Sequence, residues 1–181
     1  MTIEFNLPTN LTLLRIGLIP LITVVFYLPW EYSNLACTLI FIIAGFTDWL
    51  DGYLARKMSL ETPFGAFLDP VADKLMVAMV LVLIVQQQGS PYLAVPAAVI
   101  IGREITIASL REWMAEIGQR AKVKVSQLGK WKTTAQMLAI GMLLYRDDIL
   151  GLPVNYCGYV FLYVAAILTL WSMVNYLRAA L

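Results

Sequence analysis

Four aspartates in one short stretch of the chain could hold metal ions or accept protons. Asp48, Asp51, Asp69 and Asp73 all lie within DWLDGYLARKMSLETPFGAFLDPVADK, residues 48–74. At about 100° per residue, Asp48 and Asp51 share one helix face, and Asp69 and Asp73 share one face of a following helix. Two antiparallel helices joined by a short loop can turn these faces toward each other. The spacing therefore predicts that four carboxylates converge on one small volume.

Such a cluster is stable only if some carboxylates are protonated or if cations lie among them. Two like charges 4 Å apart repel by about 4 kcal/mol at an effective dielectric constant near 20. Insertion of a carboxylate into a bilayer costs about 2.5–3.5 kcal/mol more. Two divalent cations would cancel four negative charges, and the chain contains no histidine. Ligands that are all oxygen favour Mg²⁺ or Mn²⁺, and a pair of such ions is typical of phosphoryl transfer.

The neighbours of the aspartates suit a phosphate ligand. Gly52, Ala55 and Gly65 fall on the same helix faces and leave space, and Arg56 offers a guanidinium fork for a phosphate. The alternative is that the aspartates cap helix ends or pair with nearby basic residues at a membrane interface. That alternative suits one or two of them, but four carboxylates with this periodicity favour a site.

The elements that must position these residues are apolar helices. Of the 181 residues, 60% are hydrophobic and only 14% are charged, whereas about a quarter of a soluble domain is charged. We predict an all-α integral membrane protein, a single domain over 1–181, with six transmembrane helices and a polar active-site cavity at the cytoplasmic interface. A bilayer requires about 20 residues per helix. The predicted spans are about 11–29, 34–55, 64–87, 92–115, 127–146 and 153–177.

Basic residues predict the orientation of these spans. MTIEFNLPTN has no basic region typical of a cleaved signal, so the first span is expected to be retained. If the N-terminus is cytoplasmic, only Arg146 of the 13 Lys and Arg residues lies clearly at the outer side. Lys and Arg concentrate in cytoplasmic loops. We therefore expect the N-terminus and the four aspartates at the cytoplasmic side.

The pattern DxxDGxxAR-x8-GxxxDxxxD, which begins at Asp48, resembles the signature of the CDP-alcohol phosphatidyltransferase family. The resemblance implies that a hydroxyl group attacks the β-phosphate of a CDP-linked lipid and that CMP leaves. It further implies that Asp48, Asp51 and Asp69 are metal ligands, and that Asp73 is both a ligand of the second metal and the general base.

The resemblance also implies which residues bind the lipid substrate, which ions are used, and where and in what oligomeric state the protein occurs. It implies that CDP-diacylglycerol contacts Gly52, Ala55, Arg56 and Gly65, that the two ions are Mg²⁺ or Mn²⁺, that the protein lies in a bacterial inner membrane, and that it is a homodimer.

Three further segments point to the acceptor. NLPTNLTLLR, GREITIASLREW and GKWKTTAQM resemble the branch of the family that uses sn-glycerol 3-phosphate. Charge favours the same choice, because a phosphorylated acceptor needs cations. Arg103 and Arg111 lie about 80° apart on one helix, and Lys130 begins the next span. We predict that these three residues bind the acceptor phosphate; the alternative is that their side chains snorkel to the membrane interface.

The remaining basic residues near the aspartates or in loops are less specific. Lys122, Lys124 and Lys132 are expected to be solvated near a loop, where they could attract anionic lipid. Arg15 could snorkel or, with Thr12, form a polar pocket. Asn10 could belong to that pocket or cap the first helix.

Other functions remain open at this point. A sibling enzyme could use serine, inositol phosphate or phosphatidylglycerol as its acceptor. A divalent-cation transporter could use the aspartates as an ion path, but the predicted outer half has no matching acids. An intramembrane prenyltransferase also uses aspartate-rich motifs, but these lie on widely separated helices of a longer bundle.

Overall fold

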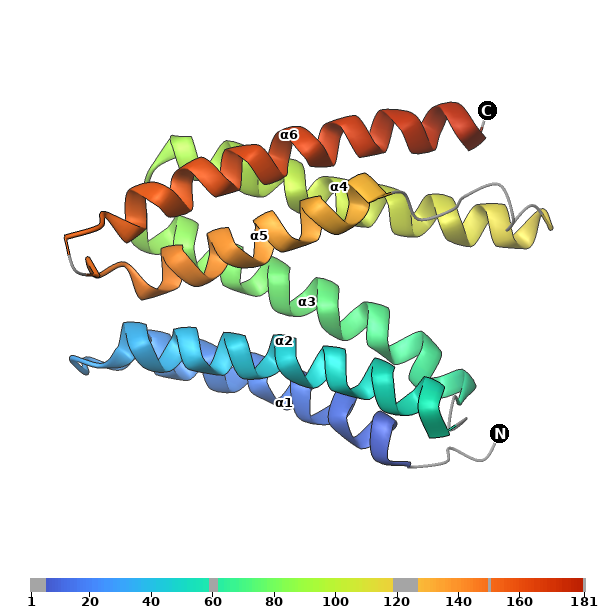
Figure 1. Ribbon diagram of the computed structural model, residues 1–181, viewed down its shortest axis with the longest axis horizontal. Coiled ribbons are helices and arrows are strands. Elements are labelled where there is room, and N and C mark those ends of the chain that lie inside the picture. The colour runs from blue at the N-terminus through green and yellow to red at the C-terminus, as the bar shows by residue number, and fades with distance from the viewer. Residues whose placement is uncertain (1–5, 59–61, 119–126, 150, 181) are drawn as a thin grey trace. The chain divides into compact units, whose positions relative to one another are not determined.

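The computed structural model describes residues 6–58, 62–118, 127–149 and 151–180, and this part of the chain contains six helices (Figure 1). The all-α prediction is confirmed, and each predicted span overlaps one helix to within a few residues. The helices are α1 (Leu7–Tyr27), α2 (Ser33–Met58), α3 (Pro63–Gln88), α4 (Pro91–Glu116), α5 (Gln127–Tyr145) and α6 (Val154–Ala180).

The prediction that all six helices cross the membrane is wrong. Within the described residues, four helices are long and apolar enough to span a bilayer: Leu7–Tyr27, Ser33–Leu54, Pro91–Glu116 and Val154–Arg178. In α3, charges at Asp69, Asp73 and Lys74 and a glutamine at Gln86 leave an apolar run only from 75 to 85. Such a run is about 16 Å long, against a hydrocarbon core of about 30 Å. The first half of α5 contains Lys130 and Lys132, and these polar residues shorten the apolar part of that helix in the same way.

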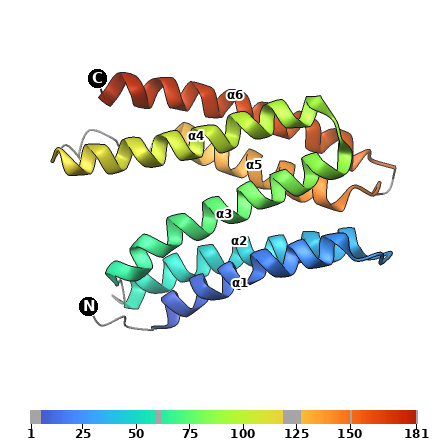
Figure 2. The same cartoon turned by 180° about the vertical axis from the view of Figure 1, so that it is seen from behind.

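The structure divides into two compact units, and the division falls within α3, between Leu83 and Ile84. In the first unit, α1 packs along α2, as both ribbon views show (Figures 1 and 2). The core between them contains Ile22, Cys37 and Phe41. The side chain of Asn6 caps α1 by accepting a hydrogen bond of 3.1 Å from the backbone N–H of Thr9. Asn10 is therefore not the cap; it lies exposed in the first turns of α1.

In the second unit, α6 packs against both α4 and α5 (Figure 2). The α5–α6 contact is close because Gly158 has no side chain. A Cβ atom built at Gly158 would lie 2.8 Å from Cγ of Leu143 and 3.2 Å from its backbone nitrogen. Ile140 and Leu162 complete the apolar core of this unit.

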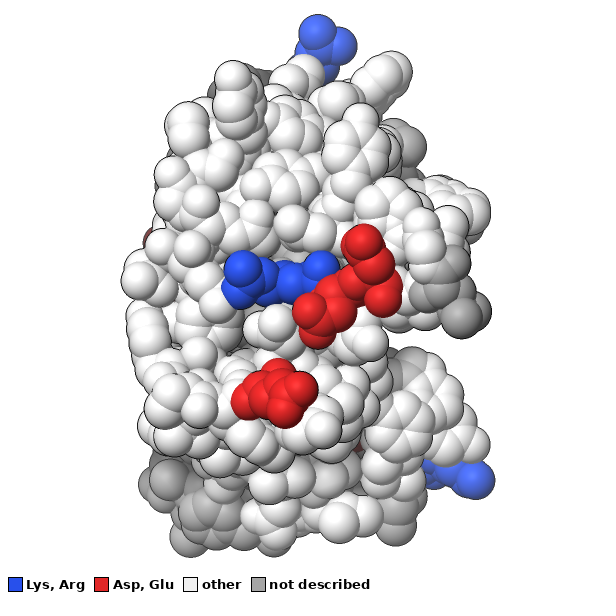
Figure 3. All heavy atoms as spheres, turned by 90° about the vertical axis from the view of Figure 1, so that its left-hand side faces the viewer, with Lys and Arg blue, Asp and Glu red and all other residues white. Residues whose placement is uncertain are grey.

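Large apolar side chains remain exposed on the helices that can span a membrane. Val24, Phe46 and Ile167 are each about three-fifths exposed. Figure 3 views the molecule along its long axis, from the end at which α1 is joined to α2, and shows few charged side chains at that end. Apolar surface of this extent would be unfavourable in water and is favourable against lipid tails. The protein is accordingly a membrane protein.

Candidate active site

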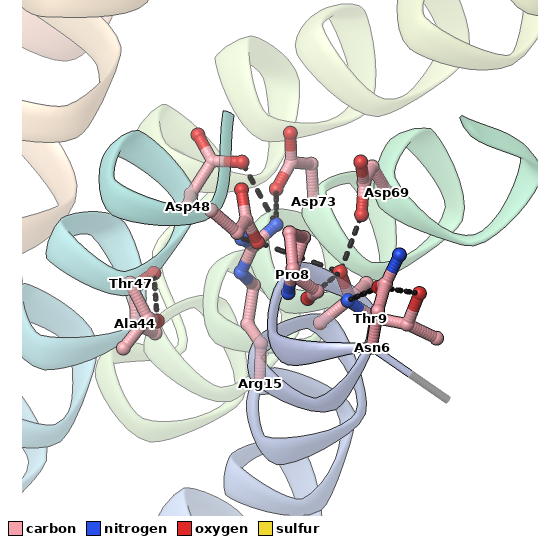
Figure 4. Close-up of polar contacts among 11 residues, drawn as sticks. Asn6, Pro8, Thr9, Arg15, Ala44, Thr47, Asp48, Asp69 and Asp73 are labelled. Atoms are coloured by element: carbon pink, nitrogen blue, oxygen red, sulfur yellow. Dashed lines mark hydrogen bonds and ion pairs between the residues drawn. The ribbon is translucent and has the colours of Figure 1, made fainter. Parts of the chain in front are cut away.

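The side chain of Arg15 lies among three of the four aspartates (Figure 4). Its Nη1 atom is 2.8 Å from Oδ1 of Asp48 and 2.5 Å from Oδ1 of Asp73, and its Nη2 atom is 2.5 Å from Oδ2 of Asp51. Arg15 is only 1% exposed. One guanidinium from α1 therefore connects two carboxylates of α2 with one of α3.

Thr12, one helical turn before Arg15, connects the fourth aspartate to the cluster. Its hydroxyl donates a hydrogen bond to Oδ1 of Asp69 and lies 3.4 Å from Oδ2 of Asp51. The structure thus brings together the four carboxylates whose convergence the spacing predicts. Their role as metal ligands stays a prediction.

The aspartate cluster, defined as Asp48, Asp51, Asp69 and Asp73, contains more negative charge than Arg15 neutralises. Four ionised carboxylates and one guanidinium leave a charge of −3 (−4 + 1). Burial and the neighbouring Asp48 raise the pKa of Asp73 to about 7, although Arg15 opposes this shift. The cluster therefore favours further positive charge.

The donor atoms of the cluster fit a hard divalent cation, because all of them are carboxylate or hydroxyl oxygens. As they stand, however, no three acidic or cysteine side chains in the described residues are grouped so that they could hold a metal ion. Three of the carboxylates instead direct an oxygen at Arg15. The residue types and charge suit the ion, but binding it requires these side chains to rearrange.

Gly65 lies one helical turn before Asp69 in α3, in a crowded position. Its backbone N–H donates to Oγ1 of Thr62 at 3.0 Å. A Cβ atom built on Gly65 would lie 3.1 Å from that oxygen and 3.4 Å from Oγ1 of Thr9. The absence of a side chain therefore permits close approach of two threonine hydroxyls. Gly52 is half-buried, whereas the side chains of Ala55 and Arg56 lie outside the described part of the structure.

Arg103 and Arg111, predicted to bind the acceptor phosphate, meet at Tyr176 of α6. Their guanidinium carbons lie 5.7 and 5.5 Å from the centre of the Tyr176 ring, within the range of a cation–π interaction. Nη2 of Arg111 donates to the Tyr176 hydroxyl at 3.2 Å. Nη2 of Arg103 donates to Oγ of Ser172 at 3.1 Å. The side chain of Lys130 lies outside the described residues.

Lys132 is not solvated, and this prediction is wrong. Lys132 is only 4% exposed, and its ammonium donates to Oε1 of Glu104, which also lies 3.2 Å from Nη1 of Arg103. Burial lowers the pKa of Lys132, while the Glu104 carboxylate opposes that shift. Glu104 therefore joins two cations of the second unit. Lys122 and Lys124 lie outside the described residues.

Comparison with known proteins identifies the family. The family model described as CDP-alcohol phosphatidyltransferase matches residues 5–171. The chain belongs to the CDP-alcohol phosphatidyltransferase family.

Curated relatives in this family match almost the whole chain. A Haemophilus influenzae protein is 57% identical over 98% of this chain and 94% of its own length. Proteins from Sodalis glossinidius and Escherichia coli K12 are 55% and 54% identical, each over 98% of this chain and 96% of their own length. All three relatives are named CDP-diacylglycerol–glycerol-3-phosphate 3-phosphatidyltransferase.

Several polar residues whose surroundings the sequence motifs do not reveal lie on buried helical stripes. Thr12 and Arg15 continue the buried stripe of α1 that includes Pro8, Ile19 and Ile22. Spacings of three and four residues along an apolar helix are the signal that could have placed both side chains inward.

In the second unit, polar residues also lie at three- and four-residue spacings on buried helix faces. Lys132 lies on the α5 face that buries Gln136, Ala139 and Leu143, at spacings of three and four residues. Ser172 and Tyr176 occupy the buried face of α6 in the same way. Their proximity to the two arginines could not be read from the sequence, because it depends on how α4 and α6 pack.

Proposed function

We propose that this protein transfers the phosphatidyl group of CDP-diacylglycerol to sn-glycerol 3-phosphate and thereby forms phosphatidylglycerophosphate and CMP. The observation that carries the proposal is the identity of 54–57% over nearly the full length to relatives whose names state these two substrates. The family signature, present from Asp48 to Asp73 without substitution, supports it.

The chemistry is a substitution at phosphorus. A hydroxyl oxygen of glycerol 3-phosphate forms a bond to the β-phosphorus of CDP-diacylglycerol, and the phosphoanhydride bond to CMP breaks. We assign the proton of that hydroxyl to Asp73, the role that the family resemblance implies. The chain has no histidine, so a carboxylate is the natural base.

Enzymes of this family depend on a divalent metal, and we propose that the aspartate cluster holds two Mg²⁺ or Mn²⁺ ions. The oxygen-only donor set and the negative charge that Arg15 leaves uncompensated support this assignment. Bound there, the ions would stabilise negative charge on the phosphates during transfer. Loss of activity in a chelator, with recovery on adding Mg²⁺ or Mn²⁺, tests the assignment.

For the lipid substrate, we propose contacts with Gly52, Ala55, Arg56 and Gly65. These residues belong to the same signature as the aspartates and lie between or beside them in sequence. Arg56→Lys keeps the charge but loses the planar fork. It should raise KM for CDP-diacylglycerol more than KM for glycerol 3-phosphate.

For the acceptor phosphate, we propose Arg103, Arg111 and Lys130. The two arginines share one aromatic partner, Tyr176, so they can act on one ligand. Arg111 is exposed, so its substitution creates no buried cavity. It is therefore a better position to test than the buried Arg103. Arg111→Gln should raise KM for glycerol 3-phosphate with little change in KM for CDP-diacylglycerol.

We also propose the cellular arrangement of the protein. Residues 1–181 form a single catalytic domain in the inner membrane, with the N-terminus and the aspartate cluster on the cytoplasmic side, where the water-soluble acceptor glycerol 3-phosphate is available. The protein is a homodimer, as the family resemblance implies. Accessibility of single introduced cysteines in intact vesicles tests the orientation, and light scattering of the detergent-solubilised protein tests the dimer.

An acceptor panel tests the reaction itself. Purified protein is incubated with CDP-diacylglycerol, Mg²⁺ and one alcohol, and CMP release is measured. Glycerol 3-phosphate should give rapid release, whereas serine, inositol phosphate and phosphatidylglycerol should not. Release with one of those three alcohols alone would assign the chain to a sibling activity.

A further inference from the structure

The contacts of Arg15 show one guanidinium holding three carboxylates that the proposed function assigns to metal ions. We infer that Arg15 is a tethered counter-cation that holds the aspartate cluster together before metal binds, and that divalent ions must displace it. This inference rests on the proposed metal-binding role of the cluster. It makes Arg15 a positioning residue that competes with the metal.

The geometry of Arg15 supports direct competition. Both Nη atoms are used, and each contacts a carboxylate oxygen within 2.8 Å (Figure 4). A carboxylate oxygen that ligates Mg²⁺ lies about 2.0–2.1 Å from the ion. The ion and the guanidinium would thus occupy the same space next to Asp48, Asp51 and Asp73, and their positive charges repel.

Burial places Arg15 on the inner side of the cluster. Its side chain is 2% exposed and that of Asp51 is 3% exposed, whereas those of Asp48 and Asp73 are 44% and 47% exposed. A cation that arrives from outside the protein therefore reaches Asp48 and Asp73 first. It meets there the two oxygens that share Nη1 of Arg15.

The helix that carries Arg15 explains why the arginine is available for this role. Arg15 follows Thr12 on the buried stripe of α1, and Thr12 bonds to Asp69. The Nε atom of Arg15 is buried and has no hydrogen-bond partner. A buried donor without a partner is unfavourable, so this geometry is not the most favourable one for an arginine with a purely structural role.

The test is Mn²⁺ binding to metal-free, detergent-solubilised protein, measured by calorimetry and by electron paramagnetic resonance. Arg15→Gln should bind Mn²⁺ about tenfold more tightly than the wild type, because the ion no longer displaces a buried, ion-paired side chain. In EDTA the same variant should unfold at a lower temperature than the wild type. Added Mn²⁺ should raise its Tm by more than it raises that of the wild type.

Two further variants make the measurement decisive. Arg178→Gln removes one positive charge from an exposed position on α6 and should bind Mn²⁺ as the wild type does. Arg15→Lys keeps the charge but cannot contact three carboxylates with a rigid fork, and it should bind Mn²⁺ more tightly than the wild type and less tightly than Arg15→Gln. If Arg15→Gln does not fold without metal, Arg15→Lys provides the comparison.

Equal or weaker Mn²⁺ binding by the Arg15 variants, with normal binding by Arg178→Gln, would overturn the inference and show that Arg15 supports the metal-bound form. That outcome leaves the proposed function intact. Absence of Mn²⁺ binding by the wild type, together with full activity in EDTA, would instead refute the metal-dependent reaction.

Discussion

The ion pair between Glu104 and Lys132 allows a quantitative prediction for the second unit. Glu104→Gln preserves the shape of the side chain but removes the negative charge that lies between Lys132 and Arg103. Lys132 and Arg103 are 4% and 9% exposed, so each would keep a buried positive charge with a weaker partner. Removing one partner of a buried pair costs about 3–5 kcal/mol.

The lower end of that range applies because Glu104 is itself 21% exposed. A loss of about 3 kcal/mol corresponds to a decrease in Tm of about 6–12 °C for a chain of this length. The assay is thermal unfolding in detergent, followed by circular dichroism. Glu112→Gln is the matched control, since Glu112 lies exposed on the same helix. Substitutions at the surface change the free energy of unfolding by only about 0.5 kcal/mol.

A double variant separates lost charge pairing from general disruption. Glu104→Gln with Lys132→Met replaces the buried ammonium by an apolar side chain of similar length. Its Tm should return to within about 2–4 °C of the wild type, since apolar replacement of a buried pair is often neutral. A double variant that unfolds as early as Glu104→Gln, or a Glu104→Gln protein with unchanged Tm, would refute the reasoning.

Three shorter predictions concern the aspartate cluster and the helix contacts. Asp69→Asn should abolish CMP release without lowering Tm by more than a few degrees, and retained turnover would argue against a ligand role for Asp69. Mn²⁺ affinity should fall as the pH drops below 7, because Asp73, whose pKa is raised to about 7, must lose its proton to bind the ion; calorimetry at pH 6 and pH 8 measures this. Gly158→Ala should destabilise the α5–α6 contact by about 1–3 kcal/mol, since its Cβ would lie 2.8 Å from Leu143. Gly141→Ala, which meets nothing within 4 Å, is the control, and equal Tm values for the two would contradict the packing argument.

Helix positions were predictable because long apolar runs are separated by short polar turns. The number of membrane spans was not predictable from helix length alone, because α3 and α5 contain polar residues that shorten their apolar runs. Asp69 and Asp73 belong to the proposed site, and the same two residues interrupt the apolar sequence of α3, which is not among the candidate spans.

Convergence of the aspartates was predictable from periodicity, since the side-chain direction repeats every three to four residues along a helix. The contact with Arg15 was not, because it requires α1 to pack with its stripe of Thr12 and Arg15 toward α2 and α3. The error on Lys132 has a similar cause. Because Lys132 lies near a loop in the sequence, its side chain was expected to be solvated. Its position on the buried face of α5 places it inside the protein instead.

The identity of the lipid product tests the central claim most directly. Protein in phospholipid vesicles is incubated with CDP-diacylglycerol, Mg²⁺ and isotopically labelled glycerol 3-phosphate. The lipids are then extracted and identified by mass spectrometry. The account predicts a labelled phosphatidylglycerophosphate that appears together with CMP in equal amount and is absent with Asp69→Asn. CMP release without label in any lipid would contradict it.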